Sequence, residues 1–221
     1  MRSALILLIV VLSALAVPLP QEDVKVFFAF FVKGDGKRPT DEGELQEMQR
    51  AHIANLQKQF AAKKLIAAGP LKDPTQVRRG IMVLTVKDDK EIAPLFETDP
   101  YVKHRIMTCE FEPWSVDVAK FNQKLPDPNA IEENRIVIVT PGQALSRPEI
   151  EAYDAHVKAT ARKGIGGWVG KPGTRAIYLF QGPEEATLKS AFESGPLFAK
   201  GAIKVEVIPL WMAKEALPAR K

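Results

Sequence analysis

The sequence is poor in the residues that form disulfides and metal sites. It has one cysteine, Cys109, and three histidines among 221 residues. A single cysteine cannot form a disulfide within the chain, so packing has to stabilise the fold. No His-x-x-x-His or Cys-x-x-Cys spacing occurs, so the sequence favours no metal site. A Gly-x-Ser-x-Gly elbow is also missing, which argues against a serine nucleophile.

Charge of one sign is not in large excess. The formal net charge of +4 comes from 31 basic and 27 acidic residues, and the two signs alternate along the chain. A clustered basic stripe, which phosphate backbones attract, is therefore not expected, and nucleic acid is not an expected partner. The 46% of hydrophobic residues is typical of a globular protein.

The N-terminal stretch is the one long apolar run. Arg2 precedes it, and the small residues Ala14 and Ala16 stand near its end in the spacing of a cleavage site. The run is shorter than the ~20 residues that span a membrane. Residues 1–16 therefore resemble a signal peptide, and we expect an exported protein, periplasmic or extracellular, without membrane attachment after cleavage. An uncleaved anchor is the alternative.

The pattern of hydrophobic residues predicts an α+β unit at residues 24–114, the first unit. β-Branched and aromatic residues predict strands at 24–32, 65–68, 80–86 and 105–114. Apolar residues at helical spacing predict a helix over 40–64, and a second helix begins at Asp88 or Asp89. The order strand, helix, strand, strand, helix, strand is that of the ferredoxin-like fold.

The same order starts again after a polar, proline-containing linker at residues 115–134. In the second unit, residues 135–212, strands are predicted at 135–140, 175–180 and 203–211, and helices from Ser146 and over 184–192. The glycine-rich stretch 164–167 is interpreted as a turn. Matching ends, such as Glu112-Pro113-Trp114 against Ile208-Pro209-Leu210-Trp211, predict a tandem repeat of about 100 residues.

The first unit resembles the YCII-related family over nearly its whole length. The motifs that carry the resemblance are AHIANL at 51–56, AAGPL at 67–71, TDPYVK at 98–103 and EPW at 112–114. The resemblance implies a unit that pairs its sheet with a second one in a dimeric α+β barrel. Here the second unit would be the built-in partner, making the chain an intramolecular pseudo-dimer, with further oligomerisation possible.

The resemblance also implies an active site. The family's histidine and aspartate fall on His52 and Asp99. Most of the family has no established reaction, although a few relatives are linked to elimination of halide from chlorinated aromatic ring compounds. Related barrel families include isomerases and cofactor-free oxygenases. The resemblance implies no cofactor.

His52 lies in the middle of an otherwise apolar helical face, where a buried imidazole needs a partner. Asp99 could fix the ring tautomer and prepare it as a general acid or base. The alternative is a core histidine bonded to a backbone carbonyl. Asp99 has a structural role of its own to consider, because Asp followed by Pro100 is typical of a helix start.

The other histidines and the cysteine are weaker candidates. His156 resembles His52 in its surroundings, but helical phase places it on the flank of its helix, and Gly195 stands where Asp99 would. We expect an exposed or pocket-rim histidine there. His104 is expected at the end of a short helix, and Cys109 as inert core on a strand.

Tyr101 and Trp114 could line an aromatic pocket for substrate, although core packing explains Trp114 equally well. The favoured hypothesis is an exported enzyme in which a His52–Asp99 pair moves a proton on a small cyclic or aromatic molecule, by elimination or isomerisation. The alternatives are a binding protein that holds a small ligand without catalysis, and a structural role. Catalysis would follow the titration of an imidazole, whereas ligand retention would not need to.

Overall fold

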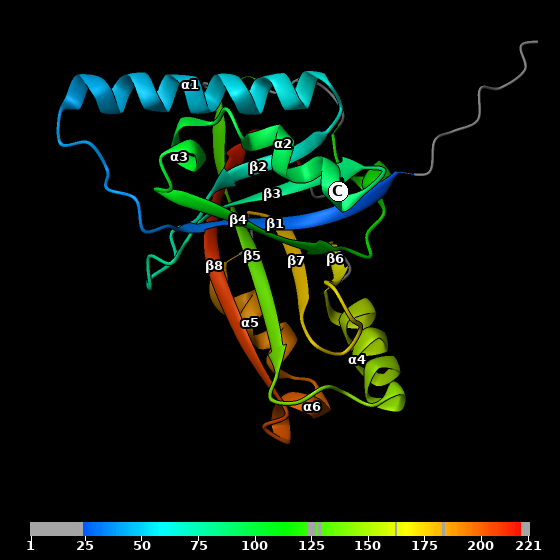
Figure 1. Ribbon diagram of the computed structural model, residues 1–221. Coiled ribbons are helices and arrows are strands. Elements are labelled where there is room, and N and C mark those ends of the chain that lie inside the picture. The colour runs from blue at the N-terminus through cyan, green and yellow to red at the C-terminus, as the bar shows by residue number, and fades with distance from the viewer. Residues whose placement is uncertain (1–23, 123–126, 128–129, 162, 183, 218–221) are drawn as a thin grey trace, which may run out of the picture.

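The chain folds as an α+β protein with two four-stranded antiparallel sheets (Figure 1). A computed structural model describes residues 24–122, 127, 130–161, 163–182 and 184–217. The predicted signal peptide at residues 1–16 lies outside the described residues. Within them, no helix is long and apolar enough to cross a membrane.

The first sheet is formed by four strands of the first unit. A 20-residue helix, α1, follows the first strand, and three short helical segments precede the last. The elements are β1 (Lys25–Lys33), α1 (Glu42–Ala61), β2 (Leu65–Pro70), β3 (Arg78–Val86), η1 (Asp89–Glu91), α2 (Ile92–Phe96), α3 (Pro100–Lys103) and β4 (Met107–Pro113). The predicted strand-helix order is therefore confirmed.

The second sheet repeats this order. A short helical segment, η2 (Val118–Lys120), lies in the connecting segment. The elements of the second unit are β5 (Ile131–Pro141), α4 (Arg147–Thr160), β6 (Ile165–Trp168), β7 (Ala176–Gln181), α5 (Glu185–Glu193), α6 (Pro196–Ala199) and β8 (Ile203–Ala213). The strand orders are β2-β3-β1-β4 and β6-β7-β5-β8. Each sheet thus has the arrangement of a split βαβ unit, in which every neighbour is antiparallel.

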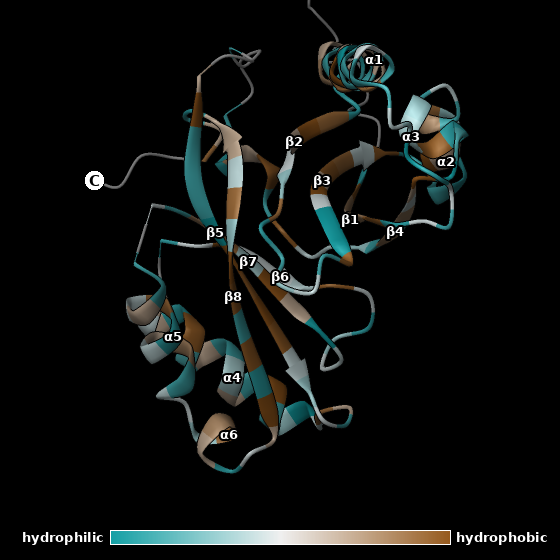
Figure 2. Ribbon diagram, turned by 90° about the vertical axis from the view of Figure 1, so that its left-hand side faces the viewer, coloured by the Kyte–Doolittle hydropathy of each residue, from teal (hydrophilic) through white to brown (hydrophobic). Residues whose placement is uncertain are grey.

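The two sheets face each other and share a core. Figure 2 shows the helices of the first unit outside one sheet and those of the second unit outside the other. Side chains alternate along β1, so Phe28, Phe30 and Val32 enter the core between the sheets. Phe27 and Phe31 point the other way, into the core under the helices. Burial on both faces explains why β1 is a continuous apolar run.

The edges of the two sheets meet and close a barrel. A bridge joins Leu71 after β2 to Leu210 in β8, and a second joins Trp114 after β4 to Val169 after β6. Gly69 permits the first contact, because a Cβ there would lie 1.9 Å from the Trp211 carbonyl oxygen. The fold is therefore the predicted intramolecular dimeric α+β barrel.

An ion cluster also connects the two units. The Arg78 guanidinium at the start of β3 donates to the Asp73 carboxylate at 3.0 Å and to the Glu206 carboxylate of β8 at 2.8 Å. Asp73 is almost fully buried. Burial alone would raise the pKa of its carboxyl, but hydrogen bonds from Arg78 and Thr75 outweigh that effect and hold the pKa far below its ordinary value.

The glycine-rich stretch at 164–167 was wrongly interpreted as a turn. Gly166 and Gly167 lie within strand β6, which pairs with β7. A Cβ on Gly166 would lie 2.4 Å from the Tyr178 ring, and one on Gly167 would lie 2.3 Å from the Ser115 carbonyl oxygen. Glycine is required here because neighbouring groups approach the strand closely. A strand built from glycines lacks the β-branched and aromatic residues by which strands are recognised in a sequence.

Candidate active site

Helix α1 places His52 on its inner side. The helix begins after Asp41, whose carboxylate caps it by accepting from the Glu44 N–H at 2.9 Å. Four side chains at intervals of three or four residues are buried along the helix: Met48, His52, Asn55 and Gln59. Three of these four buried side chains are polar, in place of the apolar neighbours expected around His52, and Leu56 and Phe60 are only half-buried.

Asp99 reaches the same place from the start of α3. Its Oδ1 accepts from the Tyr101 backbone N–H at 3.0 Å, which caps the helix ahead of Pro100. Its Oδ2 lies 2.7 Å from His52 Nδ1, a hydrogen bond between residues 47 apart in sequence. The carboxylate is fully buried. The helix-capping and histidine-pairing roles of Asp99 thus occur together.

The surroundings of the carboxylate determine the histidine tautomer. An ionised carboxylate can only accept hydrogen bonds, and Asp99 is surrounded by donors: the Tyr101 N–H and the Asn55 side-chain amide. His52 Nδ1 must therefore carry the hydrogen and donate it to Asp99. In the neutral ring this leaves Nε2 with a free lone pair, and the described residues offer Nε2 no hydrogen-bond partner.

Asn55 and Gln59 hold the carboxylate in place, and sequence reasoning missed both. The Asn55 amide donates to the Leu95 carbonyl at 3.2 Å and to Asp99 Oδ2 at 3.4 Å. The Gln59 amide donates to Asn55 Oδ1 at 3.3 Å and to the same Leu95 carbonyl at 3.1 Å. The available signal was their spacing, three and seven residues after His52 on one helical face.

Aromatic rings orient the imidazole from two sides. The Phe31 ring of β1 and the Tyr101 ring of α3 both meet the His52 ring edge to face, with centroids 5.5 and 5.3 Å away. The Tyr101 hydroxyl donates to the Gln49 side chain at 3.0 Å, which fixes that ring in turn. Tyr101 therefore lies where the sequence predicted a binding residue, in direct contact with His52.

A cavity of about 1300 Å³ opens beside this pair. Its lining is mostly apolar and comes from α1, β2, the ends of β1 and β8, and the short segment after β8. His52, Tyr101 and Phe31 all contribute to the lining, as do Leu56 and Phe60 of α1. The volume is more than enough for a small organic molecule, and a mostly apolar lining with a few polar groups is typical of small-molecule sites.

Trp114 lies elsewhere. Its ring packs in the core between the sheets, 5.2 Å from the Phe28 ring, and its Nε1 donates to the Gly167 carbonyl at 3.3 Å. The residues that line the cavity beside His52 do not include Trp114. The structure thus brings three of the four predicted site residues together and places the fourth at the joint between the units.

His156 is not the exposed or rim histidine that helical phase predicted. It is half-buried, its Nε2 donates to the Ala191 carbonyl at 2.9 Å, and its ring lies against Gly195. The flank of α4 is covered because α5 packs against it. The second unit therefore has a histidine in the corresponding place but a glycine where the carboxylate would be.

The remaining titratable candidates stay outside the site. His104 lies at the C-terminal end of α3, as predicted, and its side chain is exposed. Burial, with a smaller effect of Glu110, raises the pKa of the Cys109 thiol to about 12. Within the described ranges, histidine, cysteine and acidic side chains form no group of three or more that could hold a metal ion.

Comparison with known proteins supports the fold assignment. The YCII-related domain model matches residues 27–115, and no curated protein matches the chain in sequence. The structure is similar to that of a chlorite dismutase variant from Candidatus Nitrospira defluvii, with 12% identity and a TM-score of 0.54 over 87% of this chain and 92% of that one. At this identity the likeness shows the fold alone.

A smaller structure also matches. It is a 5-chloro-2-hydroxyhydroquinone dehydrochlorinase from Burkholderia phenoliruptrix in complex with 2,5-dihydroxybenzoquinone, 21% identical over 42% of this chain and 95% of that one. Its TM-score of 0.31 is too low to support an inference about this chain.

Proposed function

We propose that the YCII-related domain at residues 27–115 transfers a proton on a small cyclic or aromatic molecule, with His52 as the general acid or base and Asp99 as its partner. The observation that carries the proposal is the buried 2.7 Å hydrogen bond between His52 Nδ1 and Asp99 Oδ2 beside a largely apolar cavity. A histidine oriented by a hydrogen bond to a buried carboxylate beside a cleft is a geometry used by many catalytic sites.

The chemistry follows from the tautomer. His52 Nε2 takes a proton from a carbon or hydroxyl of the bound molecule, and the ring becomes an imidazolium. Asp99 stabilises that cation without moving, because it already accepts the Nδ1 hydrogen. Proton transfer by a positioned histidine contributes ~10²–10⁴ in rate.

Two outcomes are open to the substrate. In an elimination, the electron pair of the broken C–H bond forms a double bond, and the leaving group departs with its own bonding pair. In an isomerisation, the imidazolium returns the proton to a different atom. Both need the steps above and no electron acceptor. We propose one of these two reactions, and Tyr101 as the binding residue closest to the reacting atoms.

The test is proton exchange in deuterium oxide. The full-length protein is incubated with a panel of cyclic ketones and of chlorinated and hydroxylated aromatics, while ¹H NMR follows loss of C–H signals and an electrode follows chloride. The protein should exchange or convert at least one compound, and His52→Gln should slow that compound by ~10²-fold or more. His156→Gln is the matched control and should retain the wild-type rate. Equal rates in wild type and His52→Gln would refute the proposal.

A binding protein without catalysis would give a different result. It would bind members of the panel without deuterium exchange, and its affinity would not follow the titration of an imidazole. The polar network of Asn55 and Gln59 behind Asp99 favours catalysis, because a ligand held by apolar contacts alone has no need of a fixed tautomer.

We also propose that residues 1–16 direct export and are removed. The protein, expressed with its full N-terminus in a bacterial host, should be recovered outside the cytoplasm. Its mass should be that of a chain whose first residue is Val17. Recovery of the whole chain in the membrane fraction would support the uncleaved anchor instead.

A further inference from the structure

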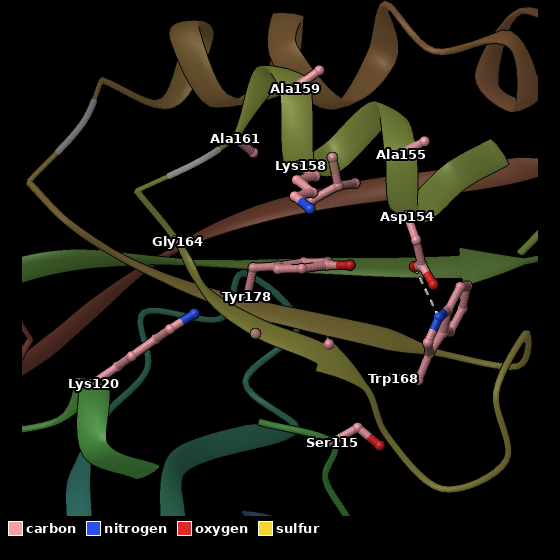
Figure 3. A pocket seen from close by; sticks show the side chains of 13 residues that line it. Ser115, Lys120, Asp154, Ala155, Lys158, Ala159, Ala161, Gly164, Trp168 and Tyr178 are labelled. Carbon is pink, nitrogen blue, oxygen red and sulfur yellow. Dashed lines mark hydrogen bonds between the residues drawn. The ribbon is translucent and has the colours of Figure 1, made fainter. Parts of the chain in front are cut away.

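The second unit has a cavity of its own, in the place that corresponds to the first. It lies between α4 and β6, as the cavity beside His52 lies between α1 and β2, and has a volume of about 990 Å³ (Figure 3). The two cavities share no lining residue in the described part of the chain. A ligand held here would therefore not occupy the His52 site.

Small residues leave the space open. On the helix side the lining includes Ala155, Ala159 and Ala161, and on the strand side Gly164, Gly166 and Gly167. The Tyr178 ring, from β7, crosses the floor beside Gly166, where any Cβ would meet it. The result is a flat aromatic surface under a helix with short side chains, which suits a planar molecule.

A carboxylate stands at one end of the cavity. Asp154 Oδ1 accepts from the Trp168 indole N–H at 3.0 Å, which fixes the group at the edge of the cavity (Figure 3). The described residues provide no other partner for it, so its second oxygen is available as an acceptor. Burial raises the pKa of this carboxyl, and the hydrogen bond from Trp168 offsets only part of the effect.

Two ammonium groups point into the cavity from opposite walls. Lys158 lies one helical turn after Asp154, yet it forms no ion pair with it and extends towards Tyr178 instead (Figure 3). Lys120 reaches up from η2 on the far side (Figure 3). Neither lysine has a carboxylate within ion-pair distance among the described residues, so both charges are free to meet an anion.

We infer that this cavity binds a small planar acid with a hydroxyl group at the end opposite its carboxylate, of the 4-hydroxybenzoate class. The ligand carboxylate lies between Lys120 and Lys158, its ring lies on Tyr178, and its hydroxyl donates to Asp154. A cationic ligand is disfavoured, because two ammonium groups face the cavity and one carboxylate does. The second unit is then a binding module, beyond its role as the partner sheet of the first.

The test is a titration of the full-length protein with 4-hydroxybenzoate and with benzoate, followed by isothermal calorimetry. We expect saturable binding of 4-hydroxybenzoate with a Kd below about 1 mM. Lys158→Met should weaken both ligands by about tenfold, since each loses a charge-assisted contact. Asp154→Asn should weaken 4-hydroxybenzoate and leave benzoate unchanged, because benzoate has no hydroxyl to donate.

Two controls make the result specific. Lys189→Met removes an exposed lysine of α5 outside the cavity lining and should bind as the wild type does. His52→Gln should also leave both affinities unchanged. If His52→Gln loses binding and Lys158→Met keeps it, the ligand lies in the first cavity and the inference is overturned. Absence of saturation at about 10 mM would overturn it as well.

Discussion

Asp99→Asn separates the two roles of this residue. The Asn side chain keeps an oxygen that can accept from the Tyr101 N–H, now at 3.0 Å, so the helix cap survives. It replaces the acceptor Oδ2 with an NH₂ group, which cannot accept from His52 Nδ1. The imidazole must then adopt the other tautomer, in which Nδ1 accepts a hydrogen bond and Nε2 carries the hydrogen. Nε2 is the nitrogen that would take a proton from the substrate.

The magnitudes differ for stability and for chemistry. Because asparagine caps helices as well as aspartate does, and a hydrogen bond to His52 is retained with its direction reversed, the free energy of unfolding should change by about 1 kcal/mol or less. Asp99→Ala loses the cap and leaves the His52 N–H unpaired, so it should cost about 2–4 kcal/mol. Proton transfer should fall by ~10²–10⁴ in both variants.

The assay does not need the substrate. Two-bond ¹H–¹⁵N NMR correlations of the imidazole distinguish an Nδ1–H ring from an Nε2–H ring at neutral pH. Wild type should show Nδ1–H at His52, and Asp99→Asn should show Nε2–H, with urea denaturation run on both as the stability control. An Nε2–H ring in the wild type would refute the tautomer argument, as would an unchanged tautomer in Asp99→Asn.

Three further outcomes follow from the structure. Gly69→Ala should lower the free energy of unfolding by about 2–3 kcal/mol in urea denaturation, because the new Cβ would lie 1.9 Å from the Trp211 carbonyl oxygen; unchanged stability would contradict the barrel closure. Arg78→Met should cost about 3 kcal/mol at neutral pH by leaving Asp73 buried without its cation. The folded pKa of Asp73 is depressed, so this stabilisation is present above pH 3.8 and is lost as pH falls; acid unfolding curves of the two proteins should therefore converge. Cys109, with a pKa of about 12, should be labelled by iodoacetamide at pH 8 far more slowly than in the unfolded chain, and equal rates would contradict its burial.

Sequence predicted the fold where local rules and tertiary packing agree. The apolar run of β1 predicted a strand and became one buried on both faces. Ser146 and Glu149 predicted a capping box, and both of its hydrogen bonds form at the start of α4. Asp99-Pro100 predicted a helix start, and α3 begins there. These signals are short in range, so one sequence is enough to find them.

The errors arose where a residue acts on a distant one. Asn55 and Gln59 look like exposed helix residues until α2 brings the Leu95 carbonyl against them. Gly166 and Gly167 look like a turn until the Tyr178 ring and the Ser115 backbone fill the space above them. Contacts of this kind depend on how the units dock, which periodicity along the chain does not encode.

The contact between the His156 ring and Gly195 limits which side chains position 195 of the second unit can accept. A Cβ on Gly195 would lie 2.9 Å from the His156 ring, so the ring occupies the space that a carboxylate at that position would need. Gly195→Asp alone would therefore meet the ring before it could pair with it, and the histidine would first have to leave its bond to the Ala191 carbonyl. A second His–Asp pair therefore requires both a carboxylate at position 195 and a different His156 rotamer, so the second unit is held in a conformation that excludes the pair found in the first.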